Sequence, residues 1–149
     1  MKKKKVVDAR FAKGRKGYLS VINQIADEAK CPFCPDNFRY HKKPILKRSG
    51  HWFLTPSTWP YKDTKHHLLI IGTQHKEQLS ELTPADWRAI ASLATHAIKK
   101  FKIPGGAITM RFGETAYTGA SVCHLHAHLI VPKLKPGKRV AKTVWFPIG

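Results

Sequence analysis

A run of three alternating histidines near the carboxyl end constrains the fold of this chain more than any other feature. Residues 121–131 have the sequence SVCHLHAHLIV, in which small or apolar residues fill the positions between and after the histidines. On an extended strand, successive side chains point to opposite faces. The run therefore predicts a strand over 124–131 that packs one face in the core and presents His124, His126 and His128 on the other.

The same three histidines indicate chemistry at a phosphate group. Imidazole is the side chain that can be neutral, nucleophilic and proton-donating near neutral pH, and three in line can attack, orient and protonate around one phosphate. A metal-binding tract or a partly buried polar edge would also explain histidines at these positions. Because apolar residues fill the intervening positions and a Gly-Ala-Ser turn at 119–121 precedes the run, we favour a catalytic strand.

The charge of the chain indicates a phosphorylated partner but not which one. Among 149 residues, 27 Lys and Arg stand against 9 Asp and Glu, which gives a net charge of +18. Such a field concentrates anions at the surface, and nucleotides, nucleic acids and anionic headgroups respond to it alike. Solubility alone would explain the charge equally well. We expect a nucleotide partner. The basic arms at 1–16 and 133–142 are candidates for contact with nucleic acid, and a solvated tail explains the first arm at least as well.

The apolar segments predict a protein with no membrane association. The basic start of the chain is followed by more charged residues instead of the apolar core of a secretory signal. The longest apolar stretches, 68–71 and 129–131, are far shorter than the roughly 20 residues that span a bilayer. Three cysteines, two of them in a Cys-x-x-Cys motif, do not suggest a disulfide framework. We therefore expect a cytoplasmic protein.

Apolar residues recur at intervals of three and four in two segments, which predicts amphipathic helices over 18–29 and 83–101. The second helix has three start signals: Thr83 can cap it, Pro84 suits its first turn, and Asp86 completes a capping box. We expect its buried side to consist of Trp87, Ile90, Ala91, Ala94, Ile98 and Phe101.

Short β-prone runs predict about five strands. They lie at 45–46, 52–54, 67–71, 107–112 and 124–131, and a Ser-Gly pair suits a hairpin between the first two. Strands joined partly by hairpins and mixed with two helices argue for an α+β fold with a mainly antiparallel sheet. We expect one domain over residues 17–149, preceded by a basic flexible arm over residues 1–16 that lacks apolar periodicity.

Cys31 and Cys34 have the two-residue gap that lets both thiolates reach one tetrahedral ion. Cys-Pro-x-Cys can also be a redox motif, but that chemistry usually sits at the start of a helix, which lowers the thiol pKa, and here the predicted helix comes before the cysteines. We favour structural zinc over redox exchange or simple packing. Spacing does not choose the remaining ligands among the candidates His41, His51, His66, His67, His75, His96 and the three alternating histidines.

The segment HLHAHLI at 124–130 resembles the signature of the histidine triad (HIT) superfamily of nucleotide hydrolases and transferases. Upstream, residues 119–122 resemble the phosphate loop of that family, and residues 67–75 resemble its His-then-apolar strand that ends at a second histidine. The resemblance spans roughly residues 31–132 and implies a HIT-like fold. Residues 145–149 are similar to the Trp-Pro-containing tail of the Hint branch, which there reaches toward a partner subunit, so a homodimer is implied.

The resemblance also implies a role for each matching residue. His126 would be the nucleophile that forms a covalent nucleotidyl-histidine, His128 would bind the phosphate or leaving group, and His67 would support the triad. Ser121, together with Gly119 and Val122 of the same loop, would bind the substrate phosphate. The zinc-bearing members imply a metal site made of Cys31, Cys34, His75 and His124.

The chain departs from the family pattern at two places. Members often carry Asn shortly after the strand before the phosphate loop, where this chain has Phe112-Gly113-Glu114. Members also often use Asp or Asn for the ribose hydroxyls, where Ser57 and Thr58 are the nearest polar residues here, so Ser57 is our candidate for that contact.

Residues and resemblance together predict an enzyme. We expect a nucleotide hydrolase or nucleotidyl transferase that acts at the α-phosphate of a nucleoside phosphoramidate, a dinucleoside polyphosphate or a related nucleotide conjugate. One alternative is removal of adenylate from a nucleic-acid 5′ end, as in the aprataxin branch, although this sequence lacks that branch's carboxy-terminal zinc finger. The other is a zinc-stabilised nucleic-acid-binding module without turnover.

Overall fold

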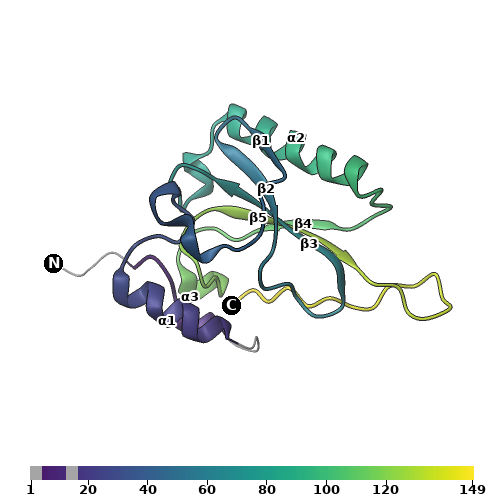
Figure 1. Ribbon diagram of the computed structural model, residues 1–149, viewed down its shortest axis with the longest axis horizontal. Helices are drawn as coiled ribbons and strands as arrows, with labels where there is room; N and C mark the ends of the chain where they lie inside the picture. The colour runs from purple at the N-terminus through teal and green to yellow at the C-terminus, as the bar shows by residue number, and fades with distance from the viewer. Residues whose placement is uncertain (1–4, 13–16) are drawn as a thin grey trace.

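A five-stranded antiparallel sheet organises the computed structural model, which describes residues 5–12 and 17–149 (Figure 1). The strand order is β1-β2-β3-β5-β4. The strands are β1 (Lys47–Ser49), β2 (Trp52–Pro56), β3 (Thr64–Gly72), β4 (Ala107–Met110) and β5 (His126–Pro132). The α+β fold with a mainly antiparallel sheet is confirmed, and Gly50, with a φ of 53°, makes the expected hairpin turn between β1 and β2.

Two main helices lie on opposite sides of the sheet (Figure 1). The helices are α1 (Tyr18–Glu28), α2 (Pro84–Lys100) and the one-turn α3 (Thr115–Thr118), and 3-10 turns occupy Ala9–Phe11, Pro35–Tyr40 and Leu79–Glu81. Helix α2 packs on β1, β2 and β3. None of the described helices combines the length and the apolar character needed to cross a membrane.

Strand β3 is apolar without alternation because both of its faces are covered. Leu68 and Ile70 belong to the core beneath α2, whereas Leu69 and Ile71 pack with Phe53 on the opposite face. Aromatic side chains from the segment before β1 close that second cluster. The sheet therefore has a fully packed face under α2 and an opposite face on which a site can be built.

The start of α2 agrees with the sequence expectation, and its buried side agrees in part. Ile90 and Ala94 are buried as expected and Phe101 packs against the core, whereas Ala91 is exposed. Thr83 and Asp86 form the predicted capping box. Trp87 and Ile98 are 46% and 42% exposed, and Leu93 and Ala97 are fully buried in their place. The buried stripe begins at Asp86, whose carboxylate accepts hydrogen bonds from Trp52 and Lys76, and continues through Leu93 and Ala97.

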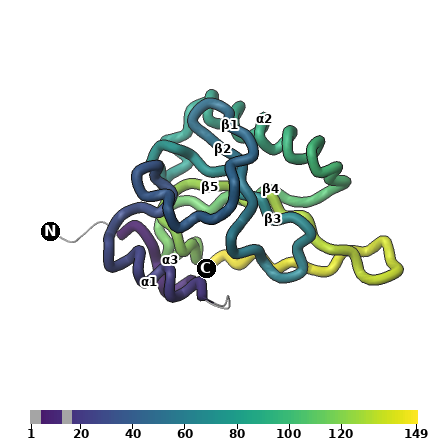
Figure 2. The backbone as a smooth tube through the Cα atoms, in the orientation of Figure 1, coloured from purple at the N-terminus to yellow at the C-terminus, as the bar shows by residue number. Residues whose placement is uncertain are grey.

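Residues 5–12 pack against the domain, which differs from the flexible arm expected over 1–16; residues 1–4 and 13–16 lie outside the described part of the chain. Val7 pairs with Val122, and the backbone N–H of Asp8 donates to the carbonyl of Ser121 at 2.8 Å. Figure 2 shows this N-terminal segment, in dark purple, beside α1. Val7 and Asp8 are only 4% and 2% exposed. The packing arises because Val7 joins an apolar cluster with α1.

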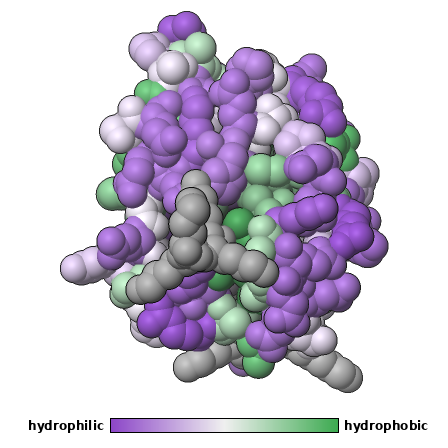
Figure 3. Space-filling view, turned by 90° about the vertical axis from the view of Figure 1, so that its left-hand side faces the viewer, coloured by the Kyte–Doolittle hydropathy of each residue, from purple (hydrophilic) through white to green (hydrophobic). Residues whose placement is uncertain are grey.

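The second basic segment, residues 133–142, forms a hairpin that projects from the sheet (Figure 1). Leu134 pairs with Ala141, and the N–H of Lys135 donates to the carbonyl of Val140 at 2.8 Å. The face of the molecule that includes α1 is mainly hydrophilic, with a band of apolar atoms through its middle (Figure 3). That hydrophilic surface agrees with the net charge of +18.

The Asp86 carboxylate joins α2 to the sheet. It accepts hydrogen bonds from Trp52 Nε1 and Lys76 Nζ, both at 2.8 Å, and from the backbone N–H of Thr83 at 2.7 Å. Burial alone would raise the pKa of Asp86, but the bonds from Lys76, Thr83 and Trp52 outweigh it and hold the pKa well below its usual range. The ionised carboxylate is therefore part of the folded state.

We expect Asp86→Ala to lower the free energy of unfolding by about 3 kcal/mol, because it removes the cap and leaves Trp52 and Lys76 without their acceptor. Urea denaturation at pH 7 measures this. Asp27→Ala, at an exposed position of α1, is the control and should change stability by less than about 0.5 kcal/mol.

The pH dependence provides a second check on Asp86. A carboxylate with a depressed folded-state pKa stabilises the protein above its unfolded pKa, about 3.9, and loses that contribution as the pH falls below it. The stability difference between wild type and Asp86→Ala should therefore shrink below about pH 4. A difference that stays constant from pH 7 to pH 3 would contradict the account.

Candidate active site and metal cluster

The three alternating histidines divide between two places. Strand β5 begins at His126, so His126 and His128 project from the strand and line a pocket, while His124 precedes it. The His124 ring lies beside that of His75, with 5.2 Å between ring centroids. The predicted strand over 124–131 starts two residues too early, because His124 lies outside β5, whereas the family resemblance had already assigned His124 to the metal site and His126 and His128 to the catalytic site.

The His126 ring is held in one tautomer by the backbone. Its Nδ1 lies 2.7 Å from the carbonyl oxygen of His124. A carbonyl can only accept, so Nδ1 carries the proton and the lone pair of the neutral ring is on Nε2. Burial lowers the pKa of His126 to about 4, and the nearby positive charge of Arg111 acts in the same direction. The ring is therefore neutral at pH 7.

A chain of hydrogen bonds fixes the protons of His67 and His128. The backbone N–H of Tyr61 donates to Nδ1 of His67 at 3.0 Å, so neutral His67 carries its proton on Nε2. That Nε2 lies 2.9 Å from Nδ1 of His128. Because His67 donates to this nitrogen, neutral His128 carries its proton on Nε2. The Tyr61 ring stacks on both imidazoles, at centroid distances of 4.7 and 5.8 Å.

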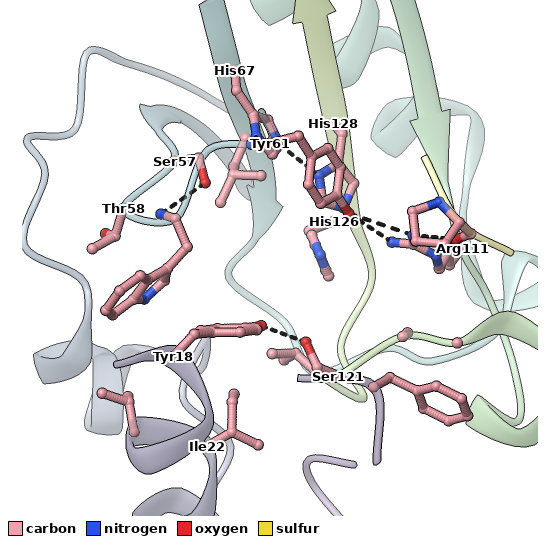
Figure 4. A pocket seen from close by; sticks show the side chains of 18 of the residues that line it. Tyr18, Ile22, Ser57, Thr58, Tyr61, His67, Arg111, Ser121, His126 and His128 are labelled. Atoms are coloured by element: carbon pink, nitrogen blue, oxygen red, sulfur yellow. Dashed lines mark hydrogen bonds between the residues drawn. The ribbon is translucent and has the colours of Figure 1, made fainter. Parts of the chain in front are cut away.

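The pocket in front of these histidines has a volume of about 490 Å³. One end is apolar and aromatic, with Tyr18 and Ile22 of α1 and the indole of Trp59. Arg111 lies at the other end, and His126 lies between the two (Figure 4). A pocket with one apolar end and one cationic end suits an elongated ligand that has an aromatic group and negative charge.

The residues predicted to bind substrate all line this pocket. They are Gly119, Ser121, Val122 and Ser57. The hydroxyl of Ser121 hydrogen-bonds the hydroxyl of Tyr18 (Figure 4), and Ser57 Oγ accepts from the backbone N–H of Trp59 at 3.2 Å. The 119–122 loop is thus held by α1 on one side and by residues 5–12 on the other.

The C-terminal residues fold back onto the pocket. The ring of Phe146 lies edge-on to that of His128 at a centroid distance of 5.1 Å, and the carbonyl of Pro147 accepts from Arg111 Nε at 3.0 Å. The resemblance implied a tail that reaches toward a partner subunit; in this chain the tail contacts its own site. These contacts place the tail beside the histidines.

Several pocket residues were missed from the sequence. Tyr18 was assigned only to a helix, and Trp59, Tyr61 and Arg111 stand outside any motif. Their positions depend on segments far apart in the chain, so periodicity gave no signal. The run of aromatic residues between β2 and β3 was the one available hint.

The predicted metal ligands form one cluster: Cys31, Cys34, His75 and His124. Their ligand atoms all lie within 4.8 Å of one another, and Cys31 Sγ is 3.3 Å from Nδ1 of His124. In a tetrahedral zinc site, neighbouring sulfur and nitrogen ligands lie about 3.5 Å apart. The four residues could therefore hold a metal ion such as zinc.

The proton positions of the two imidazoles also suit a metal. Nε2 of His124 donates to the carbonyl of Gly72 at 2.7 Å, and Nε2 of His75 donates to Glu77 Oε1 at 2.8 Å. Both rings therefore present the lone pair of Nδ1 to the thiols, and such outer hydrogen bonds orient metal-ligating histidines. Burial lowers the pKa of His124 to about 4, which keeps its ring neutral.

Comparison with known proteins agrees with this geometry. The HIT domain family matches residues 62–134, the part of the chain that contains His67 and the triad. This part of the chain is a HIT domain. Among curated proteins, it is 29% identical over 79 residues to the CWF19-like protein 1 homolog of Drosophila melanogaster, which covers 53% of this chain. The match spans only 14% of that relative's length.

Solved structures of HIT proteins share the fold. A histidine triad nucleotide-binding protein from Candida albicans has 21% identity to this chain and a TM-score of 0.59. The superposition covers 80% of this chain and 85% of that protein's chain. A zinc-bound histidine triad family protein from Mycobacterium smegmatis has 20% identity and a TM-score of 0.54. Here the superposition covers 75% of this chain and 80% of that protein's chain.

We expect protein purified without chelator to contain about one zinc ion per chain, and Cys31→Ser/Cys34→Ser to contain none, because two of four ligands are lost. Elemental analysis measures the metal. The double variant should also melt at a lower temperature, since a bound metal stabilises the folded state by mass action.

Cys123→Ser is the matched control, because Cys123 stands outside the cluster, and this variant should keep its zinc. Wild-type protein without stoichiometric metal would refute the zinc site. A double variant that retains stoichiometric zinc would refute the site as well.

Proposed function

We propose that this protein is a nucleotide hydrolase or nucleotidyl transferase that acts at the α-phosphate of a nucleoside phosphoramidate, a dinucleoside polyphosphate or a related conjugate. The observation that carries the proposal is the His126 ring, which lines the pocket, is neutral, and donates from Nδ1 to the His124 carbonyl, so that its lone pair is on Nε2. A neutral imidazole held in this way is a nucleophile.

The reaction has two displacement steps. In the first, the lone pair of His126 Nε2 attacks the α-phosphorus, the bond to the leaving group breaks, and the leaving group takes the electron pair. The Nε2–H of His128 donates a hydrogen bond to the atom that departs. An amine leaving group also takes up a proton from the surrounding water, so that it departs as a neutral amine. In the second, water attacks the phosphorus, the P–N bond breaks with its electron pair returning to Nε2, and the proton of the water passes to solvent. Each step is easier than direct hydrolysis.

The loop at 119–122 supports the phosphate. Ser121 lines the pocket together with His126, and its hydroxyl would donate to the phosphate oxygens on which negative charge grows; donors fixed in advance lower the barrier most effectively. Tyr18 aligns the Ser121 hydroxyl, and the pairing of Val7 with Val122 holds the loop backbone. The aromatic end of the pocket receives the base, and Ser57 lies within the same wall to bind the ribose.

Zinc, where it binds Cys31, Cys34, His75 and His124, supplies a structural crosslink between the loop before β1, the end of β3 and the start of β5. His124 then has two functions at once. Its ring binds the metal, and its carbonyl orients His126. The cluster therefore stabilises the backbone on which the nucleophile depends.

Removal of adenylate from a nucleic-acid 5′ end is the second candidate, and one observation favours it. The basic hairpin 133–142 starts at the pocket rim, where the N–H of Lys133 donates to the carbonyl of Asp63 at 2.8 Å and Asp63 lines the pocket. A strand whose end enters the pocket would meet these lysines. A non-catalytic nucleic-acid-binding module is distinguished from both enzymes by the absence of any covalent intermediate.

We expect His126→Ala to lower turnover of a nucleoside phosphoramidate by about 1000-fold or more, because the nucleophile is lost. Intact-protein mass spectrometry after brief exposure to a panel of nucleotides should show a nucleotidyl adduct on wild type and none on the variant. The adduct mass identifies the transferred group.

His51→Ala is the control, since His51 is exposed in the β1–β2 turn, far from the pocket. It should form the adduct like wild type. Full activity in His126→Ala would exclude this nucleophile, and binding of RNA by wild type with no adduct from any nucleotide would favour the non-catalytic module.

A further inference from the structure

The two ends of the pocket differ in chemistry. Tyr18 and Ile22 mark its apolar end, Arg111 marks the opposite end, and His126 lies between them (Figure 4). In an in-line displacement, the leaving group departs on the side away from the attacking nitrogen. With the base at the aromatic end and the α-phosphate at His126, the rest of the substrate extends past His128 toward Arg111.

Arg111 follows β4 directly and is fixed in place by neutral groups. Its guanidinium carbon lies 3.7 Å from the centroid of the Phe146 ring, and its Nε and Nη2 donate to the Pro147 carbonyl, the first at 3.0 Å. Nη1 and Nη2 both lie 3.4 Å from the hydroxyl of Tyr61. Phe146 also packs edge-on against His128, with 5.1 Å between ring centroids, so Arg111 and His128 share one aromatic neighbour.

The charge of Arg111 is not neutralised by the described residues. The ion pairs found among them involve other cations: Lys5, Arg10, Arg39, His75, Lys76 and Lys142. A guanidinium held by a carbonyl, a hydroxyl and an aromatic ring keeps its full positive charge. Such a group in a pocket attracts an anion, and hydrogen bonds between arginine and phosphate are among the strongest in proteins.

We propose that Arg111 binds the leaving group, and that the substrate is a nucleotide conjugate whose leaving group is itself a phosphate or polyphosphate. The inference rests on the proposed function and selects among its substrates. When the bond between the α-phosphorus and the bridging oxygen breaks, that oxygen takes the electron pair and the departing phosphate gains negative charge. The N–H groups of Arg111 stabilise this charge without transferring a proton, because arginine stays protonated. An uncharged amine leaving group would gain nothing comparable.

The test compares two substrates with the same nucleoside, a dinucleoside tetraphosphate and a nucleoside phosphoramidate with an uncharged amine. The quantity of interest is the ratio of their kcat/KM values. Arg111→Gln should lower both values, but it should lower the ratio of tetraphosphate to phosphoramidate by about 100-fold, as for loss of one charge-stabilising donor. Arg111→Lys, which keeps the charge without the planar group, should give an intermediate ratio.

Arg88→Gln is the matched control, because Arg88 is an exposed arginine of α2, on the other face of the sheet. Its ratio should equal that of wild type. A ratio in Arg111→Gln that stays within about threefold of the wild-type ratio would overturn the inference. Circular dichroism establishes that each variant is folded. Formation of the nucleotidyl adduct from the phosphoramidate by Arg111→Gln shows that His126 still reacts in this variant.

Failure of the proposed function has a different signature. In that case wild type forms no adduct with either substrate, and Arg111 is tested by binding alone. Titration calorimetry with inorganic triphosphate should then show at least about tenfold weaker binding to Arg111→Gln than to wild type or Arg88→Gln. Equal binding to all three proteins would overturn the inference independently of catalysis.

Discussion

The hydrogen bond from Nδ1 of His126 to the carbonyl of His124 is the contact on which the site depends. It decides which nitrogen of His126 carries the lone pair, and it joins two parts of the molecule that would otherwise be separate. On one side of the bond is a cluster of two thiols and two imidazoles. On the other is a pocket with the size and polarity of a nucleotide site. A single peptide carbonyl couples them because His124 precedes the strand while His126 begins it.

The sheet fixes the remaining geometry. Strands β3 and β5 pair antiparallel, with Leu69 opposite His128 and Ile71 opposite His126, so the imidazoles share one face of the sheet with these buried apolar side chains. His67, from β3, reaches His128 because the two strands are hydrogen-bonded neighbours. Helix α2 covers the other face of the sheet and leaves this one to the site. The proton chain from Tyr61 through His67 to His128 is thus a consequence of strand register.

The sequence predicted the parts of the structure that depend on local patterns. Alternation identified β5, a Thr-Pro-Ala-Asp segment identified the start of α2, and the Cys-x-x-Cys motif led to the cluster with His75 and His124 that the family resemblance implied. Long-range contacts decided the rest. Asp86 is buried with hydrogen bonds from Trp52 and Lys76, and Arg111 contacts Phe146 and Pro147, which are distant from it in sequence. No period or motif encodes such contacts.

The tautomer of His126 is the central claim, and nitrogen-15 NMR of the histidine side chains measures it directly. At pH 7, the spectrum of zinc-loaded protein should show His126 protonated on Nδ1 and unprotonated on Nε2, with His128 in the opposite tautomer. The resonance that is present in wild type and missing from the His126→Gln variant belongs to the His126 ring. An imidazolium at His126, or a neutral ring with its proton on Nε2, would contradict the account.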